Sequence, residues 1–348
     1  MAGPTGAVGS TGVAGPTGVA GSTGAAGPTG AAGATGAASI VPGPAGSTGS
    51  TGATGAAGSA SIYGDGSDGT TVGVCNINAS ISWISGASVP ATDIQCTNFN
   101  IASGVILNVP SGTVIHATGT VTITGTLTVG DATTPTNPAS AGGPGWVAQT
   151  PTVPTGGIAF SPTTLRHLLK PGPHGGGPGG NNQSPGFDGL GGGAVTIAAA
   201  GAISIAGSGA INANGGNGFG IGTGNSTGGG GAGFIILMSK TSISNSGNIN
   251  AKGGNGVADN PGNFSCSGGG GGGLIHLLAP TGQITAGTQT VTGGSPGSPC
   301  SNDGFAYGGG ASGGNGGAGG TSATEPASGS AGLKLTTFVA DPSTLIVP

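Results

Sequence analysis

The chain has 348 residues, of which 86 are glycine and only 4% are charged, and its formal net charge is -4 at pH 7. Five basic residues are too few to attract nucleic acid or an anionic membrane by charge, and no apolar run approaches the length of about 18 residues that spans a bilayer. The apolar residues include few aromatics, so we expect a thin, regular β core.

Glycine occupies every third position from Gly3 to Gly36 and again from Gly43 to Gly58. This period fits neither a helix nor a strand, but a collagen triple helix requires it because only glycine fits at the crowded axis. A flexible Gly/Ser linker would have no reason to keep this phase. We expect residues 1–60 to form a collagen-like stalk, interrupted near 37–42, and the protein to be a homotrimer.

Residues 61–96 are expected to form a joint and an N-terminal cap. Asp65 and Asp68 lie here, and we interpret them as a polar turn rather than a pair of catalytic or cation-binding carboxylates. Cys75 and Cys96 flank the end of this segment and are predicted to form a disulfide that closes the first turn of the body.

The other two cysteines, Cys266 and Cys300, lie in glycine-rich loops one repeat apart, and we predict a second disulfide between them. Buried free thiols are the alternative for all four cysteines. No cysteine and histidine spacing typical of a zinc site occurs, and we expect neither metal nor cofactor.

Two parts of the chain predict a right-handed parallel β-helix, or solenoid. Residues 97–132 contain short β-branched runs separated by glycines and no intervening helix. Residues 193–332 contain related units that begin 40 residues apart, at Gly193, Gly233 and Gly273. Apolar residues of successive units are expected to pair across the coils, and residues 333–348 to form a final strand or cap. These residues are Ile197, Ile203, Ile205 and Ile211 in the first unit, and Leu237, Ile243 and Ile249 in the second.

Each of these units ends in a long glycine-dominated loop. Glycine has no side chain to bury, so such a loop can become ordered only through backbone hydrogen bonds. Because the loops recur once per coil, we favour a stacked lattice of extended polyglycine II strands. The alternative is that the loops have no fixed structure.

Residues 133–192 interrupt the repeat and contain tryptophan, histidine and basic side chains, which are rare elsewhere in the chain. The segment SPTTLRHLLK predicts a short helix with a serine N-cap. Binding residues often lie on such an insertion, but the segment could equally plug one end of the solenoid, and metal binding by its two histidines is less favoured. The candidate binding residues here are Trp146, Arg166, His167, Lys170 and His174.

Exposed loop tips supply the remaining candidates for binding. Aromatic side chains that stand among glycines are suited to grip sugars or protein loops. The candidates are Phe219, Phe264 and Tyr307, with Asn225 beside the first.

The triplets GPTGAVGSTG resemble the collagen-like segments of bacteriophage tail fibres and of bacterial exosporium or surface filaments. Units such as INAKGGNG resemble glycine-rich β-solenoids of bacterial surface proteins and phage receptor-binding tips. The resemblance implies a non-enzymatic, homotrimeric fibre or receptor-binding component of a virion, with a host-surface glycan or outer-membrane protein as partner.

The alternative is an extracellular bacterial appendage or spore-surface protein that packs into filaments with other subunits. No secretory leader follows Met1, which favours the virion, whereas the disulfides favour the cell surface. An enzyme acting on carbohydrate is the least favoured class, because the nine acidic residues are scattered and match no catalytic motif. We expect no nucleic-acid binding and no membrane insertion.

Overall fold

The computed structural model describes residues 61–84, 92–130, 156–161, 164, 169, 176–177, 179, 189–221, 225–257, 267–297, 307–320 and 324–346. The chain divides into two compact units, Met1–Ser61 and Ile62–Pro348. The predicted triple-helical stalk, with its interruption near 37–42, lies outside the described residues and stays a prediction.

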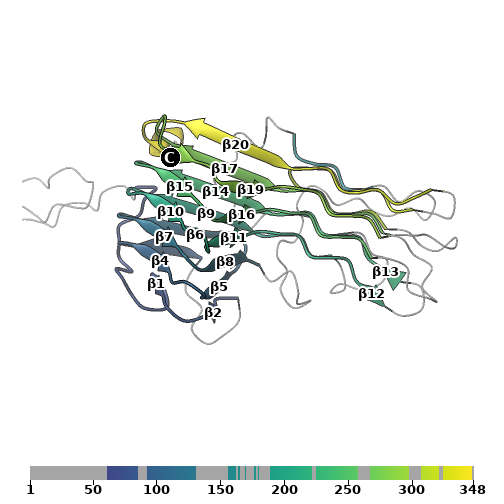
Figure 1. Ribbon diagram of the computed structural model, residues 1–348, viewed down its shortest axis with the longest axis horizontal. Coiled ribbons are helices and arrows are strands. Elements are labelled where there is room, and N and C mark those ends of the chain that lie inside the picture. The colour runs from purple at the N-terminus through teal and green to yellow at the C-terminus, as the bar shows by residue number, and fades with distance from the viewer. Residues whose placement is uncertain are drawn as a thin grey trace, which may run out of the picture. The chain divides into compact units, whose positions relative to one another are not determined.

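The body is a parallel β-solenoid made of three six-stranded sheets (Figure 1). Sheet I runs from edge to edge through β20 (Leu333–Phe338), β17 (Leu274–Ala279), β14 (Phe234–Ser239), β9 (Ala194–Ala199), β6 (Thr113–Ala117) and β3 (Asp93–Cys96). Sheet II contains β1 (Asn76–Ile77), β4 (Phe99–Ile101), β7 (Val121–Ile123), β10 (Ile203–Ile205), β15 (Ile243–Asn245) and β18 (Ile284–Thr285). Sheet III contains β19 (Thr288–Thr290), β16 (Asn248–Asn250), β11 (Ala210–Asn212), β8 (Thr126–Val129), β5 (Ile106–Val109) and β2 (Ile81–Ser82).

Successive coils visit sheets I, II and III in turn and then return to sheet I one layer further along. Phe234 of β14 pairs with Ala194 of β9 on one side and with Leu274 of β17 on the other, so the register advances by 40 residues between these strands. The predicted pairings across the coils are confirmed for Ile197 with Leu237, Ile203 with Ile243, and Ile211 with Ile249, whereas Ile205 pairs with Asn245.

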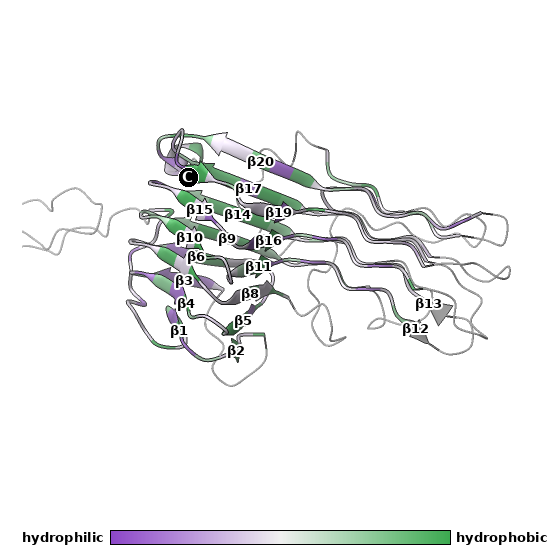
Figure 2. Ribbon diagram, viewed as in Figure 1, coloured by the Kyte–Doolittle hydropathy of each residue, from purple (hydrophilic) through white to green (hydrophobic). Residues whose placement is uncertain are grey.

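The core lies inside the three sheets and consists mainly of isoleucine, valine and leucine side chains. Alternate residues of a strand point to opposite faces, so Ile235 and Leu237 of β14 enter this core while Ile236 and Met238 face outward. Figure 2 shows the hydrophobic residues concentrated on the strands of the solenoid. The middle strands β9, β14 and β17 of sheet I are buried on both faces, because other segments cover the outer one.

The cover of sheet I comes from both ends of the body. Tyr63, just after the joint begins, packs with Ile236 and Met238, and Ile346 packs against the same cluster. The Tyr63 hydroxyl donates a hydrogen bond to Asp341 Oδ1 at 2.6 Å, which ties the joint to the residue that caps the 3-10 helix η1 (Pro342–Leu345). The joint is thereby fixed to the C-terminal end of the chain.

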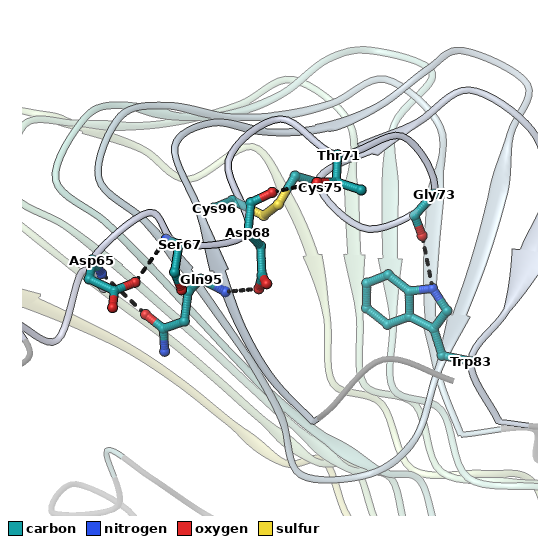
Figure 3. The surroundings of a disulfide bond; sticks show 9 residues. All are labelled: Asp65, Ser67, Asp68, Thr71, Gly73, Cys75, Trp83, Gln95 and Cys96. Atoms are coloured by element: carbon teal, nitrogen blue, oxygen red, sulfur yellow. Dashed lines mark hydrogen bonds between the residues drawn. A yellow bond between two sulfur atoms is a disulfide. The ribbon is translucent and has the colours of Figure 1, made fainter. Parts of the chain in front are cut away.

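The N-terminal end of the solenoid is closed by a disulfide-linked cap (Figure 3). Cys75 and Cys96 are bonded with a Cα–Cα distance of 5.6 Å, which confirms the predicted pair. Trp83 is 1% exposed and donates its indole N–H to the Gly73 carbonyl, while Gln95 N donates to Asp68 Oδ2. The predicted Cys266–Cys300 bond lies outside the described residues.

Candidate functional site

Beyond the solenoid, the chain runs out from sheet III and back to sheet I in extended, glycine-rich rows (Figure 1). Hydrogen bonds between their backbones join these rows side by side, and we call the set the glycine lattice. It consists of 156–160, 176–179 (of which 178 is not described), 189–193, 213–218, 227–233, 251–257, 267–273, 291–297, 307–312, 314–320 and 324–332.

The row 267–273 donates hydrogen bonds in three directions that repeat every third residue. Its N–H groups bond to three different rows, and each row is reached twice, three residues apart. The bonds run from Gly268 and Gly271 to Tyr307 and Gly310, from Gly269 and Gly272 to Ala327 and Ser330, and from Gly270 and Gly273 to Gly254 and Ala251. A repeat of three residues is that of a threefold extended helix, not of a β-strand, whose side-to-side period is two.

The carbonyl groups of the same row accept hydrogen bonds from three further rows with the same period. The donors are Gly297 and Gly294 to Ser267 and Gly270, Gly229 and Ala232 to Gly268 and Gly271, and Gly317 and Gly314 to Gly269 and Gly272. Row 267–273 is therefore enclosed by six neighbours, and the backbone groups of its glycines are paired, as burial requires.

The close approach of the rows explains why they are made of glycine. A Cβ atom on Gly270 would lie 1.9 Å from the Gly230 carbonyl oxygen, and one on Gly268 would lie 2.0 Å from that of Gly317. Equivalent collisions occur for Gly230 and Gly294. The predicted ordered arrangement of the loops is thus supported for the described rows, since no side chain larger than hydrogen fits at these positions.

Asparagine–glycine pairs fix each outbound row to the next. Asn217 Oδ1 accepts from the N–H of Asn255 at 2.9 Å, and Gly218 donates its N–H to the carbonyl of the same residue at 2.7 Å. The pair Asn255–Gly256 holds Ser295 in the same way, with distances of 2.9 and 2.8 Å. The asparagine side chain thus accepts a hydrogen bond from the backbone of the next row, beside the one that the glycine N–H donates. In the sequence this pair is the NG of the GGNG repeats.

The described parts of the insertion 133–192 belong to the lattice and to the cover of sheet I. Gly157 donates to the Gly309 carbonyl, Gly177 donates to Ala311, and the Phe160 ring lies 5.8 Å from that of Phe234. Ser161 Oγ accepts from Thr164 N at 3.1 Å, as expected of a serine N-cap. These contacts favour packing over binding for this part of the insertion. The candidates Trp146, Arg166, His167, Lys170 and His174 lie outside the described side chains.

The far end of the lattice carries the short antiparallel hairpin of β12 (Gly220–Ile221) and β13 (Asn225–Ser226), away from the three sheets (Figure 1). Phe219 precedes it with its side chain 54% exposed, as predicted, and its N–H donates to Thr227 Oγ1 at 2.7 Å. Phe264 lies outside the described residues. Phe219 is therefore the aromatic candidate that the structure places in solvent.

The expectation that Tyr307 stands exposed at a loop tip is wrong. Its side chain is only 2% exposed, and an isolated β-bridge joins it to Ser267 at the start of the central row. Burial raises the pKa of its hydroxyl, which has no hydrogen-bond partner among the residues that the structure describes. Its sequence context is rich in glycine like that of Phe219, but the row to which it belongs lies deeper in the lattice.

The titratable groups with shifted pKa values serve structural contacts. Burial alone would raise the pKa of Asp341, but hydrogen bonds from Tyr63, Ser343 and Lys240 outweigh it and hold this pKa well below its usual range. Hydrogen bonds from Ser67 lower the pKa of Asp65, which forms the expected polar turn.

His276 of β17 is 2% exposed, and burial lowers its pKa to about 4, so it is neutral at pH 7. Its Nε2 lies 2.8 Å from Thr337 Oγ1, whereas its Nδ1 has no partner within the described part of the chain. Among the described residues, no group of three or more histidine, cysteine or acidic side chains could hold a metal ion.

Compared with known proteins, the chain matches no family model, and no curated protein or solved structure is significantly similar to it. Within the part of the chain that the structure describes, no helix is long and apolar enough to cross a membrane. What the chain does must therefore be argued from the lattice and the solenoid themselves.

Proposed function

We propose that the protein is a non-enzymatic adhesion protein, a trimeric fibre or receptor-binding component of a phage tail, whose lattice carries a host-binding end. The observation that supports this best is the exposed Phe219 at the far end of rows that are bonded in three directions. An aromatic side chain in solvent on a rigid support is suited to bind a glycan or an outer-membrane protein. Three copies on one stalk would strengthen weak single contacts through effective concentration.

The proposal includes finer structural features. We assign the rows to polyglycine II because their bonds repeat every third residue, and we assign a right-handed winding to the solenoid, as in nearly all parallel crossovers. The homotrimer rests on the glycine period of residues 1–60. Analytical ultracentrifugation of the intact protein at micromolar concentration tests the trimer, and a monomer would contradict it.

Attachment is tested with two phenylalanines of similar exposure. Phe219→Ala removes the aromatic side chain at the end of the lattice, whereas Phe338→Ala removes one that is 56% exposed at the end of β20. Labelled protein is applied to a panel of bacterial cells and to immobilised glycans. We expect Phe219→Ala to lose most of the retained signal and Phe338→Ala to keep it. Equal retention by the two folded variants would contradict the role of the lattice end.

The absence of enzymatic activity is part of the proposal, and the uses of the acidic side chains support it. Asp341 caps η1 and binds Tyr63, Asp68 accepts from Gln95 N, and Asp65 accepts from Ser67 N. Each of these carboxylates already accepts hydrogen bonds that fix the joint or the cap. Hydrolysis of host polysaccharide by the purified protein, measured as released reducing sugar, would contradict this part.

One observation favours the second candidate, an extracellular bacterial appendage or spore-surface filament. The Cys75–Cys96 disulfide is typical of proteins that work outside the reducing cytoplasm. Electron microscopy of the purified protein separates the two functions, because a tail-fibre component is expected as discrete particles and an appendage as filaments.

A further inference from the structure

The outermost outbound row of the glycine lattice departs from the pattern that joins the earlier rows. In rows 213–218 and 251–257 an Asn–Gly pair binds the next row, but row 291–297 has Ser295–Pro296 at the equivalent place. Proline has no N–H to donate, and serine has a shorter side chain than asparagine. Row 291–297 therefore lacks the Asn–Gly pair that would hold another row.

The neighbouring donor of this row is also unused. Gly215 and Gly253 occupy the equivalent position in the earlier rows, and each donates its N–H to the next row, to Lys252 and Thr292 respectively. Within the described residues, the N–H of Gly293 makes no such bond. Its side of the row is partly exposed, so water can satisfy the group.

The last coil of the solenoid also departs from the earlier coils, at positions that continue the columns of core residues. Gln289 of β19 continues a column of sheet III that holds Leu127, Ile211 and Ile249 in the earlier coils. In sheet I, Lys334 and Thr336 of β20 continue the columns of Ile275 and Leu277, and both side chains are exposed. Polar and charged residues thus stand at positions that are aliphatic in the layers before them.

The opposite end of the solenoid is closed by different means. The Cys75–Cys96 disulfide and the buried Trp83 belong to the cap that covers the first coil. A repeat array needs such ends, because an open coil would present unpaired backbone and apolar core to another copy.

We propose that the final coil and the outbound row 291–297 form a stop that prevents the body from stacking end to end on another copy of this chain. The solenoid then does not extend into a filament through its C-terminal end. The features act together, since Ser295–Pro296 closes the lattice and Gln289, Lys334 and Thr336 close the core. The inference does not depend on what the far end of the lattice binds.

The test restores the pattern of the inner layers with Gln289→Ile, Ser295→Asn, Pro296→Gly, Lys334→Val and Thr336→Val in the full chain. A matched control carries similar changes at exposed residues away from the final coil, Thr241→Val and Ser244→Asn on the side of the solenoid and Lys252→Val in the lattice row 251–257. Sedimentation velocity is recorded from 1 to about 100 µM. We expect the restored variant to form species larger than the native oligomer as concentration rises, and the native and control proteins to keep one sedimentation coefficient.

A restored variant that sediments like the native protein at every concentration would overturn the proposal, as would native protein that itself grows with concentration. If the variant with five substitutions does not fold, the double variant Ser295→Asn, Pro296→Gly is tested in its place. It changes only the exposed edge of the lattice. Hydrogen exchange of the native protein gives a separate readout at the Gly293 amide. We expect the same fast exchange at 1 and 100 µM, and protection that grows with concentration would also overturn the stop.

Discussion

Replacing Gly270 with alanine tests whether the lattice is held by contact between bare backbones. The new Cβ would lie 1.9 Å from the Gly230 oxygen and 2.4 Å from its carbon, so the rows 227–233 and 267–273 must separate. That separation weakens the bonds from Gly229 to Gly268 and from Ala232 to Gly271. Each of the two bonds contributes about 1 kcal/mol net, and overpacking adds about 1–3 kcal/mol, so we expect a loss of up to about 3–5 kcal/mol in the free energy of unfolding.

Gly207 provides the matched control. A Cβ there would meet nothing closer than the Ser246 oxygen at 3.9 Å, and alanine restricts the unfolded chain, so Gly207→Ala should be neutral or stabilising by up to about 1 kcal/mol. Urea unfolding followed by circular dichroism gives the global change, and hydrogen exchange of the Gly229 and Ala232 amides gives the local one. If the two variants unfold alike and both amides stay protected in Gly270→Ala, the proposed contact between the rows is wrong.

Three other outcomes are expected. Cys75→Ser with Cys96→Ser opens a link across 21 residues and should lower the free energy of unfolding by about 3 kcal/mol, with the loss also seen when reductant is added to native protein but not to the variant. His276 has a folded pKa of about 4, below its unfolded value of about 6.5, so its contribution to stability is complete above pH 6.5 and falls as the pH drops toward 4. His276→Leu should flatten that part of the stability curve, and an unchanged slope would contradict the buried neutral state. Gly18→Val should lower the melting temperature of residues 1–60 while the circular dichroism of the body is retained, and equal melting would argue against a triple helix.

Much of the solenoid could be predicted from the sequence because its signals are local or periodic. The 40-residue spacing of Gly193, Gly233 and Gly273 predicted the register that β9, β14 and β17 adopt. The disulfide between Cys75 and Cys96 followed from their position at the start of the repeats. In both cases the information lies in the identity and spacing of particular residues.

The arrangement inside the lattice could not be predicted in the same way. Its bonds join backbone groups, so a glycine in the sequence does not indicate which of six neighbouring rows it faces. For the same reason Tyr307 was expected in solvent, although it is buried. The inclusion of Gly157 and Gly177 from the insertion had no side-chain signal either. The Asn–Gly pairs were a usable signal, since Asn217 and Asn255 recur at equivalent places.

The enclosure of row 267–273 has a consequence for digestion. A protease binds a substrate segment in extended form by pairing with its backbone and by filling pockets with its side chains. Six consecutive glycines, Gly268 to Gly273, offer no side chain to fill a pocket, and their N–H and carbonyl groups are already used by six surrounding rows. An enzyme could cut this row only after the bonds in all these directions had opened together, so the lattice should outlast ordinary loops of the same composition in fluids rich in proteases.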